Sequence, residues 1–213
     1  MKQMLRQVVI AAGLAVGMSL STAALAQTIV DEWASVRTPP PPELKPVTID
    51  PNTTALLMLD FMNQNCGKRQ HCLASIPAVS KFLAGARARG VLVVYTMFGK
   101  TTIADILKDV APTGNEPVVS SGPDKFLNTD LDKILKDKGI RTVIAIGTSA
   151  HGAVLYTASG AGLRGMKVII PVDGVSSGDA TAAYTEQYTA WHLANAPTVS
   201  SNVTLTKFDM VKF

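Results

Sequence analysis

Short apolar runs alternate with helical stretches along most of this chain, and this alternation constrains the fold more than any other feature. The first run, TALLMLD at residues 54–60, is apolar up to its final acid, which is typical of a strand buried on both faces. Further strands are expected at residues 91–97, 117–120, 142–146, 166–173 and 202–208, and helices at residues 75–90, 128–139, 153–165 and 179–196. The pattern predicts a three-layer α/β/α domain around a doubly wound, mostly parallel sheet of six strands.

The first 26 residues have the features of a secretory signal peptide. MKQMLR carries two positive charges, VVIAAGLAVGMSL is an apolar core, and Ala24-Leu25-Ala26 forms a small-x-small cleavage site before Gln27. The apolar core is shorter than the ~20 residues that a membrane span needs, so we expect cleavage rather than a retained anchor. We therefore expect an exported, periplasmic protein that has no membrane attachment after cleavage.

A proline-rich segment at residues 27–50 separates this leader from the domain expected at residues 51–213. It contains TPPPPELKP at residues 38–46, and four consecutive prolines favour extended polyproline II over helix. We interpret the segment as an N-terminal arm that packs either along the domain or along a partner subunit.

Composition and motifs exclude several classes of function. The chain has 20 Lys and Arg against 16 Asp and Glu, and no basic run is interleaved with aromatic residues, so nucleic acid is not an expected partner. The sequence has no GxxxxGK[ST] and no H-E-x-x-H, and its G-x-G-x-x-G, GAGLRG at residues 160–165, ends an expected helix instead of joining a strand to a helix, which leaves dinucleotide, P-loop and zincin readings without support. We expect a small-molecule substrate and no cofactor.

The two cysteines, Cys66 and Cys72, bracket the short stretch CGKRQHC. An oxidising compartment would favour a disulfide that closes this loop. A metal site with His71 is the alternative, but one loop offers only three soft ligands and no second cluster follows, so we expect no metal. Free thiols also stay open, because spacing alone does not give the geometry of a bond.

Two places in the sequence are candidates for chemistry. Asp60 ends the first strand, and such an acid either faces the binding crevice of a doubly wound sheet or caps a loop. The stretch GTSAHGAVLYTA at residues 147–158 contains Ser149 and His151, but His151 replaces the second glycine of a G-x-S-x-G elbow, so no nucleophilic serine is predicted. Small residues there leave amide N–H groups free to point at an anion or carbonyl oxygen. His151 either lines the pocket or packs against the following helix.

Three segments together resemble the isochorismatase-like hydrolases, also called cysteine hydrolases. They are TALLMLDFMN, KFLNTDLDKILKDKGIRTVIAIG and GTSAHGAVLYTASGAGLRGMKVIIPVDGVSS, and the resemblance runs from about Thr54 to the C-terminus. It implies a Rossmann-like sheet of six parallel strands and a homo-oligomer. Many members use an aspartate, a lysine and a cysteine, and the aspartate matches Asp60.

The other two family positions depart from the pattern. The cysteine lies six residues after the glycine that matches Gly147, which is Ala153 here, so the nucleophile is missing. The usual lysine position is Ser120, and the only nearby lysine is Lys125. Lys125 either reaches the crevice from a shifted loop or is an unrelated surface charge. The metal ligands of nicotinamidase-type members have no match in TMFGKTTIADI.

The resemblance implies a hydrolase that works without a thiol. True isochorismatases also lack the cysteine and protonate a vinyl ether through the aspartate. In thiol-dependent members a cis peptide bond, here Thr148–Ser149, aims the N–H groups of two residues at the substrate oxygen, here Ser149 and Ala153. We therefore expect a hydrolase of a small anionic metabolite in which Asp60 is the general acid and base and Lys125 positions an anionic group. The expected substrate contacts are Asn63, Ser149, His151 and Ala153.

Isochorismate is disfavoured as the substrate, because it is a cytoplasmic intermediate and this chain has an export signal. The alternative to a hydrolase is a catalytically inactive member that binds a small molecule, since two of the three family positions are altered. A third reading is a structural role for an exported oligomer.

Overall fold

The computed structural model describes residues 28–178 and 180–213, so the signal peptide expected at residues 1–26 lies outside the described residues. The chain divides into a unit that ends at Thr38 and a compact unit at Pro39–Phe213. The described part of the first unit contains a short helix, α1 (Ile29–Glu32), and a 3₁₀ turn at Trp33–Ser35. Among the described helices, none has both the length and the apolar character needed to cross a membrane.

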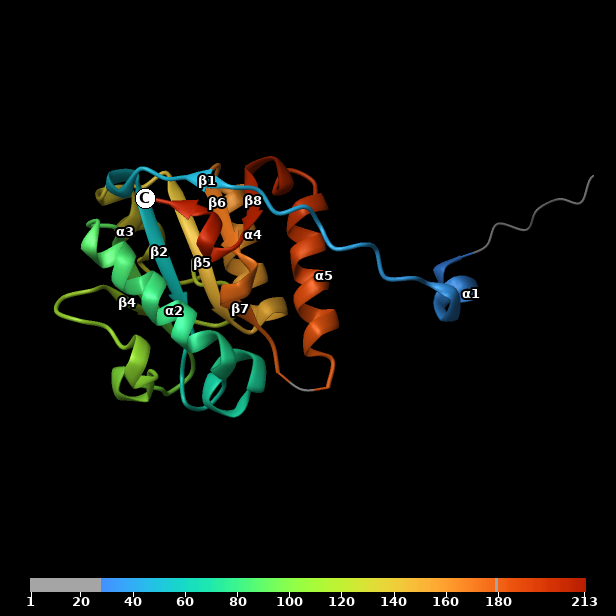
Figure 1. The fold of residues 1–213 in the computed structure, drawn as a ribbon, viewed down its shortest axis with the longest axis horizontal. Coiled ribbons are helices and arrows are strands. Elements are labelled where there is room, and N and C mark those ends of the chain that lie inside the picture. Colours follow the sequence, from blue (N-terminus) through green and yellow to red (C-terminus); the bar gives the residue numbers. More distant parts are fainter. Residues whose placement is uncertain (1–27, 179) are drawn as a thin grey trace, which may run out of the picture. The chain divides into compact units, whose positions relative to one another are not determined.

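A parallel sheet forms the centre of the second unit, as the sequence predicts (Figure 1). Within the described residues, six strands form a continuous path, and a short strand, β7 (Val175–Ser176), pairs with the end of β5. The path runs through β4 (Val118–Ser120), β3 (Leu92–Met97), β2 (Thr54–Leu59), β5 (Thr142–Thr148), β6 (Lys167–Pro171) and β8 (Val203–Thr206).

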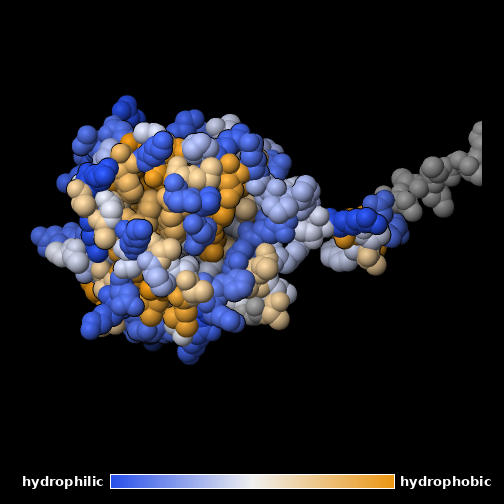
Figure 2. Space-filling view, in the orientation of Figure 1, coloured by the Kyte–Doolittle hydropathy of each residue, from blue (hydrophilic) through white to orange (hydrophobic). Residues whose placement is uncertain are grey.

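Helices cover both faces of this sheet, which gives the three layers. The long helix α2 (Gln70–Ala88) packs on one face and contributes Val79 and Leu83 to its core. The other face is covered by α3 (Leu131–Asp137), α4 (Leu155–Leu163) and α5 (Ala182–Asn195). Every residue of β2 is buried, because its side chains point alternately into these two cores. On the face shown in Figure 2, hydrophobic residues are interspersed with hydrophilic ones.

Helix α2 begins earlier than the sequence analysis predicts. The prediction placed its start at residue 75, whereas the helix begins at Gln70 and includes Cys72. Proline is best tolerated in the first turn of a helix, where the N–H would have no partner. In the structure Pro77 lies inside the helix instead. The extra turns bring Cys72 next to Cys66, which the short 3₁₀ helix Cys66–Lys68 carries.

Residues 39–48 extend along the domain. The backbone N–H of Lys45 donates to Leu205 O, and Gln187 Nε2 donates to Pro39 O. Farther on, β1 (Val47–Thr48) pairs with β9 (Val211–Lys212) in a separate two-stranded sheet. These contacts tie both ends of the compact unit to its body.

Candidate active site

The strand order reverses between β2 and β5. From β2 the chain continues to β3 and β4 on one side, and from β5 it continues to β6 and β8 on the other. The connecting helices α2 and α4 lie on opposite faces of the sheet, and in such folds the ligand binds at the carboxyl ends of the two strands where the order reverses. Asp60 directly follows β2 and Ser149 directly follows β5. Both candidate regions of the sequence therefore lie at the topological switch point.

Gly147 allows the ends of these two strands to lie side by side. It pairs with Leu59 in register, and its φ of 141° falls in a region that side chains disfavour. A Cβ atom on Gly147 would lie only 2.0 Å from the carbonyl oxygen of Leu59. Only glycine therefore fits at this position, immediately beside Asp60.

Asp60 is held firmly at the end of its strand. Its φ of 54° is a left-handed conformation that non-glycine residues rarely adopt and that clusters at functional sites. The backbone N–H of Asp60 donates to Thr96 Oγ1 at 3.1 Å, and the Thr96 hydroxyl donates to Asp60 Oδ1 at 2.6 Å. Thr96 therefore fixes both the backbone and one carboxyl oxygen of Asp60.

Lys125 reaches the same carboxyl group from the loop that follows β4. Its Nζ lies 2.8 Å from Asp60 Oδ2 and donates to the carbonyl oxygens of Met97 at 3.1 Å and Ser121 at 3.3 Å. The side chain of Lys125 is fully buried. Of the two alternatives for Lys125, an unrelated surface charge is therefore wrong, because the side chain is buried against Asp60. Its three donors are already used, so it has none to spare for an anionic group of a substrate.

Burial raises the pKa of the Asp60 carboxyl above its ordinary value, and the charge of Lys125 and the Thr96 hydroxyl only partly oppose this shift. Desolvation disfavours the carboxylate, whereas the ammonium group and the hydroxyl favour it. A carboxyl with a raised pKa keeps its proton to higher pH, which is the property that a general acid needs.

The turn after β5 has the backbone that the resemblance implies, without the thiol. The Thr148–Ser149 peptide bond is cis. A single wide turn follows at Ala150–Val154, in which Gly152 departs from helical geometry. The backbone N–H groups of Gly152 and Val154 donate to Ser149 O. Ala153 is buried in this turn, and its methyl group can neither attack a substrate nor transfer a proton.

Two of the predicted substrate contacts, His151 and Asn63, are exposed, in contrast to the buried Asp60–Lys125 pair. His151 is exposed, and its Nδ1 lies 3.3 Å from Ser177 Oγ. Asn63 is exposed, and its backbone N–H donates to Asp105 O. Ser149, which is half-buried, and Ala153 lie in the turn itself. The structure thus brings together Asp60, Lys125 and the turn at the switch point, with His151 beside β7.

The cysteine loop also contributes to this edge of the sheet. Cys66 and Cys72 form a disulfide, and His71 pairs with Glu186 at 3.0 Å between Nδ1 and Oε2. Within residues 28–178 and 180–213, no group of three or more His, Cys, Asp or Glu residues is placed to hold a metal ion. Arg69, which no sequence pattern singled out, also lies in this loop and donates from Nη1 to Thr148 Oγ1 at 2.6 Å.

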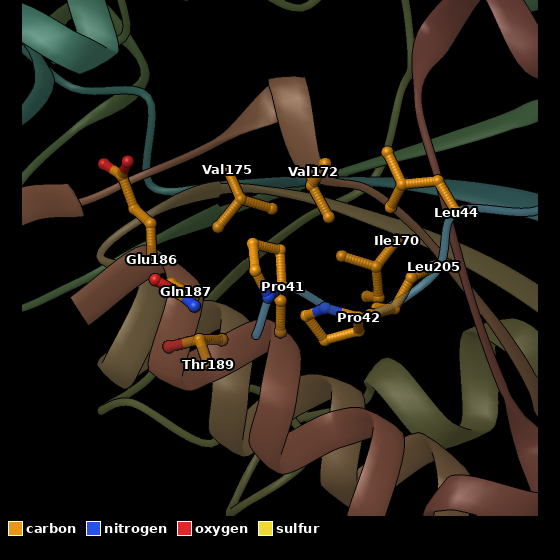
Figure 3. A pocket seen from close by; sticks show the side chains of 11 residues that line it. Pro41, Pro42, Leu44, Ile170, Val172, Val175, Glu186, Gln187, Thr189 and Leu205 are labelled. Atoms are coloured by element: carbon orange, nitrogen blue, oxygen red, sulfur yellow. The ribbon is translucent and has the colours of Figure 1, made fainter. Parts of the chain in front are cut away.

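A separate apolar pocket of about 320 Å³ does not have the chemistry of an active site (Figure 3). Its walls come from the proline-rich arm, from aliphatic residues in and beside the sheet and from one side of α5, and the carboxylate of Glu186 points away from the prolines. That carboxylate already accepts from the Ser177 N–H and contacts His71. The lining residues are Pro41, Pro42, Leu44, Ile170, Val172, Val175, Glu186, Gln187, Thr189, Ala190 and Leu205.

The fold and the site define a three-layer α/β/α domain with a buried carboxyl group at the switch point of its parallel sheet. The isochorismatase domain family matches residues 54–203, which include Asp60, Lys125 and Ala153. This chain belongs to the isochorismatase family.

Individual relatives agree with this assignment. The secreted isochorismatase effector Isc1 of Verticillium dahliae is 27% identical over 148 residues, which cover 63% of this chain and 78% of that protein. Among solved structures, a cysteine hydrolase from Pseudomonas syringae pv. phaseolicola has a TM-score of 0.67 at 20% identity, over 79% of this chain and 94% of the other. N-carbamoylsarcosine amidase from Thermoplasma acidophilum has a TM-score of 0.62 at 21% identity, over 74% and 97%. At these identities the two structures show the shared fold.

Proposed function

We propose that this chain is a thiol-independent hydrolase that cleaves the vinyl ether of a small anionic metabolite, with Asp60 as the proton donor. One observation carries the proposal. A buried carboxyl group with a raised pKa lies at the switch point, fixed by Lys125 and Thr96, while alanine occupies the position of the family thiol. Such a site has an acid and no nucleophile. Vinyl ether hydrolysis needs the first and not the second.

The reaction begins with proton transfer from the Asp60 carboxyl to the terminal methylene carbon of the vinyl ether, which leaves an oxocarbenium ion. Water then adds to the ether carbon and returns a proton to the Asp60 carboxylate. The resulting hemiketal passes its hydroxyl proton to the ether oxygen as the C–O bond breaks, which releases a ketone and an alcohol. Lys125 stabilises the carboxylate while the cation exists, because its Nζ is 2.8 Å from Oδ2.

The turn after β5 supplies the opposite wall of the crevice in this mechanism. The N–H groups of Ser149 and Ala153 would bind an oxygen of the substrate, and His151 and Asn63 would contact its polar groups from the rim. We propose no metal and no cofactor, because proton transfer and addition of water need neither.

We further propose export to the periplasm, with residues 1–26 removed, an arm at residues 27–50 and the hydrolase domain at residues 51–213, acting as a homo-oligomer. The name of the Verticillium dahliae relative supports export, because that relative is a secreted isochorismatase. The same name makes isochorismate the first substrate to test, although the sequence analysis disfavoured it on grounds of location.

The test is a substrate panel with one informative variant. The panel contains vinyl ethers (isochorismate and 2-phenoxyacrylate), an amide (nicotinamide) and an ester (4-nitrophenyl acetate). We expect turnover of a vinyl ether, and Asp60→Asn should lower kcat by about 10²- to 10⁴-fold, the usual contribution of a general acid. Asp109→Asn is the matched control, because Asp109 is an exposed acid.

The second candidate function is a binding protein without catalysis, which Ala153 favours. Under that alternative the wild type turns over no member of the panel above background but still binds one of them. Such a result would overturn the hydrolase proposal. If Asp60→Asn turns over the substrate at the wild-type rate, Asp60 is not the proton donor, but the chain is still a hydrolase.

A further inference from the structure

The guanidinium group of Arg69 lies over the carboxyl end of β5, beside the crevice. Its Nη1 donates to Thr148 Oγ1 at 2.6 Å, and Thr148 is the last residue of β5. Because Gly147 pairs with Leu59, Thr148 and Asp60 are the next residues on two neighbouring strands. The guanidinium of Arg69 is therefore bound at the end of β5, and Asp60 lies at the end of the neighbouring strand β2.

Arg69 fits closely against the chain on its other side. A Cβ atom on Gly178 would lie 2.7 Å from Arg69 Nε, so the absence of a side chain at residue 178 makes room for the guanidinium. Thr148 also pairs in register with Ser176, and the two side chains share one face of the sheet. The Ser176 hydroxyl is buried and has no hydrogen-bond partner among the described residues. A cation and an unsatisfied hydroxyl thus flank Thr148.

The charge of Arg69 is not neutralised by the part of the chain that the structure describes. Arg69 is half-buried, yet no carboxylate of the described residues lies within 4.0 Å of it, and among those residues its guanidinium hydrogen-bonds only to Thr148. By contrast, the half-buried Arg87 pairs with Glu116 at 2.7 Å. Glu186, which lies along the same edge, is bound by Ser177 and His71. A guanidinium has five N–H donors, so Arg69 retains donors for an anion.

The cysteine loop holds Arg69 in this position. The disulfide between Cys66 and Cys72 closes the loop on either side of Arg69, whose N–H donates to Cys66 O at 3.0 Å. The side chain of Asn65 accepts from the N–H of Cys66 at 2.6 Å. A guanidinium on a fixed backbone loses less conformational entropy when it binds an anion.

We propose that Arg69 binds a carboxylate of the substrate and selects anionic substrates. The inference rests on the proposed function and names the group that recognises the anion. Lys125 does not do so, because its ammonium group is engaged by Asp60, Met97 and Ser121. A guanidinium binds a carboxylate through two parallel N–H···O bonds, so Arg69 orients the substrate as well as attracting it. The vinyl ether carbon then faces Asp60.

A pair of probes that differ only in charge tests this proposal. 2-Phenoxyacrylate carries a carboxylate beside the vinyl ether, and methyl 2-phenoxyacrylate has the same scissile bond without the charge. Arg69→Gln should raise KM for the acid by about 10- to 100-fold, the range for a hydrogen bond to a charged group, with a smaller change in kcat. KM and kcat for the ester should stay at the wild-type values. Arg69→Lys should recover part of the loss, because it restores the charge without the paired donors.

Lys68→Gln is the matched control, because Lys68 is an exposed cation of the same loop. It removes the same charge and should leave both substrates unaffected. Equal losses for acid and ester in Arg69→Gln would indicate a structural role and overturn the proposal, as would no loss for either. A similar loss in Lys68→Gln would mean that the effect comes from net charge and not from the position of Arg69. That result would also overturn the proposal.

A binding measurement separates this inference from the proposed function. 2-Phenoxypropionate lacks the double bond and cannot be hydrolysed by the proposed mechanism, so its affinity is independent of turnover. In calorimetric titration of the full chain, Arg69→Gln should weaken its binding by about 10- to 100-fold, and Lys68→Gln should not. If the wild type binds 2-phenoxypropionate through Arg69 but hydrolyses neither ester nor acid, the proposed function fails while this inference stands. If the wild type does not bind 2-phenoxypropionate, or binds it equally after Arg69→Gln, the inference fails.

Discussion

The ammonium group of Lys125 lies 2.8 Å from Oδ2 of Asp60, and both side chains are almost completely shielded from solvent. The pair joins the end of β2 to the loop after β4 across the intervening strand β3, whose Thr96 binds the other carboxyl oxygen. Burial raises the pKa of Asp60, and the charge of Lys125 limits the rise. Lys125 therefore sets the pH range over which Asp60 holds its proton.

Replacing Lys125 tests this relationship directly. In Lys125→Met the opposing charge is gone, so the pKa of Asp60 should rise by a further 1 to 3 units, roughly the effect of one nearby opposite charge. ¹³C NMR titration of the aspartate carboxyl groups measures this shift without any need for turnover. If Asp60 is the general acid, the alkaline limb of the pH–rate profile should move upward by the same amount. Thr96→Val should produce a smaller shift in the same direction, because it removes one hydrogen bond to the carboxylate.

Replacing Lys125 should also change how the free energy of unfolding depends on pH. Because the folded pKa of Asp60 lies above its ordinary value of 3.8, its contribution to the free energy of unfolding is fully present below pH 3.8 and is lost as pH rises through the folded pKa. The higher pKa of Asp60 in Lys125→Met should extend this loss to higher pH, so the free energy of unfolding should fall by more between acid and neutral pH. Lys108→Met, at an exposed lysine, is the control and should change neither curve. An unchanged Asp60 titration in Lys125→Met would contradict the coupling.

The sequence predicted the strands better than the residues of the site. Buried parallel strands appear as continuous apolar runs, so β2 was identifiable. Its final acid left Asp60 open between the crevice and a loop cap, and the family resemblance favoured the crevice. β7 was not predicted, because two residues paired by tertiary contacts have no periodicity of their own. Lys125 was left open between two roles, because the path of an irregular loop depends on packing. Arg69 gave no signal, because its position depends on a disulfide loop and on Gly178 far along the chain.

A thiol at residue 153 should become reactive if the turn after β5 faces the Asp60–Lys125 pair. In Ala153→Cys the ammonium group of Lys125 would favour the thiolate, so the pKa of the thiol should lie below about 8.5, the value for a free cysteine. The pH dependence of alkylation by iodoacetamide measures it, because the native cysteines are joined in a disulfide. Ser159→Cys, on helix α4, supplies the ordinary thiol for comparison. An equal or higher pKa at residue 153 would show that the turn and the pair do not share one pocket.

Gly147 should tolerate no side chain. In Gly147→Ala the new methyl group would meet Leu59 O at 2.0 Å in a backbone conformation with φ of 141°, so the free energy of unfolding should fall by at least about 2 kcal/mol. Urea denaturation measures the loss. Gly139→Ala is the control, because Gly139 also has a positive φ but nothing lies within 4 Å of its Cβ position, and it should cost only about 1 kcal/mol. Similar losses at both positions would mean that the close approach beside Asp60 is unimportant.

The disulfide between Cys66 and Cys72 should stabilise the fold and keep Arg69 in place. The double variant Cys66→Ala with Cys72→Ala should lose about 2 kcal/mol of unfolding free energy, the loop-closure effect expected for so short a loop. It should also raise KM for 2-phenoxyacrylate and leave that for the methyl ester unchanged, because a looser loop no longer fixes the guanidinium beside Thr148. Wild-type protein treated with a reductant should behave in the same way. A double variant with normal selectivity for the acid would show that α2 and Asn65 hold Arg69 without the disulfide.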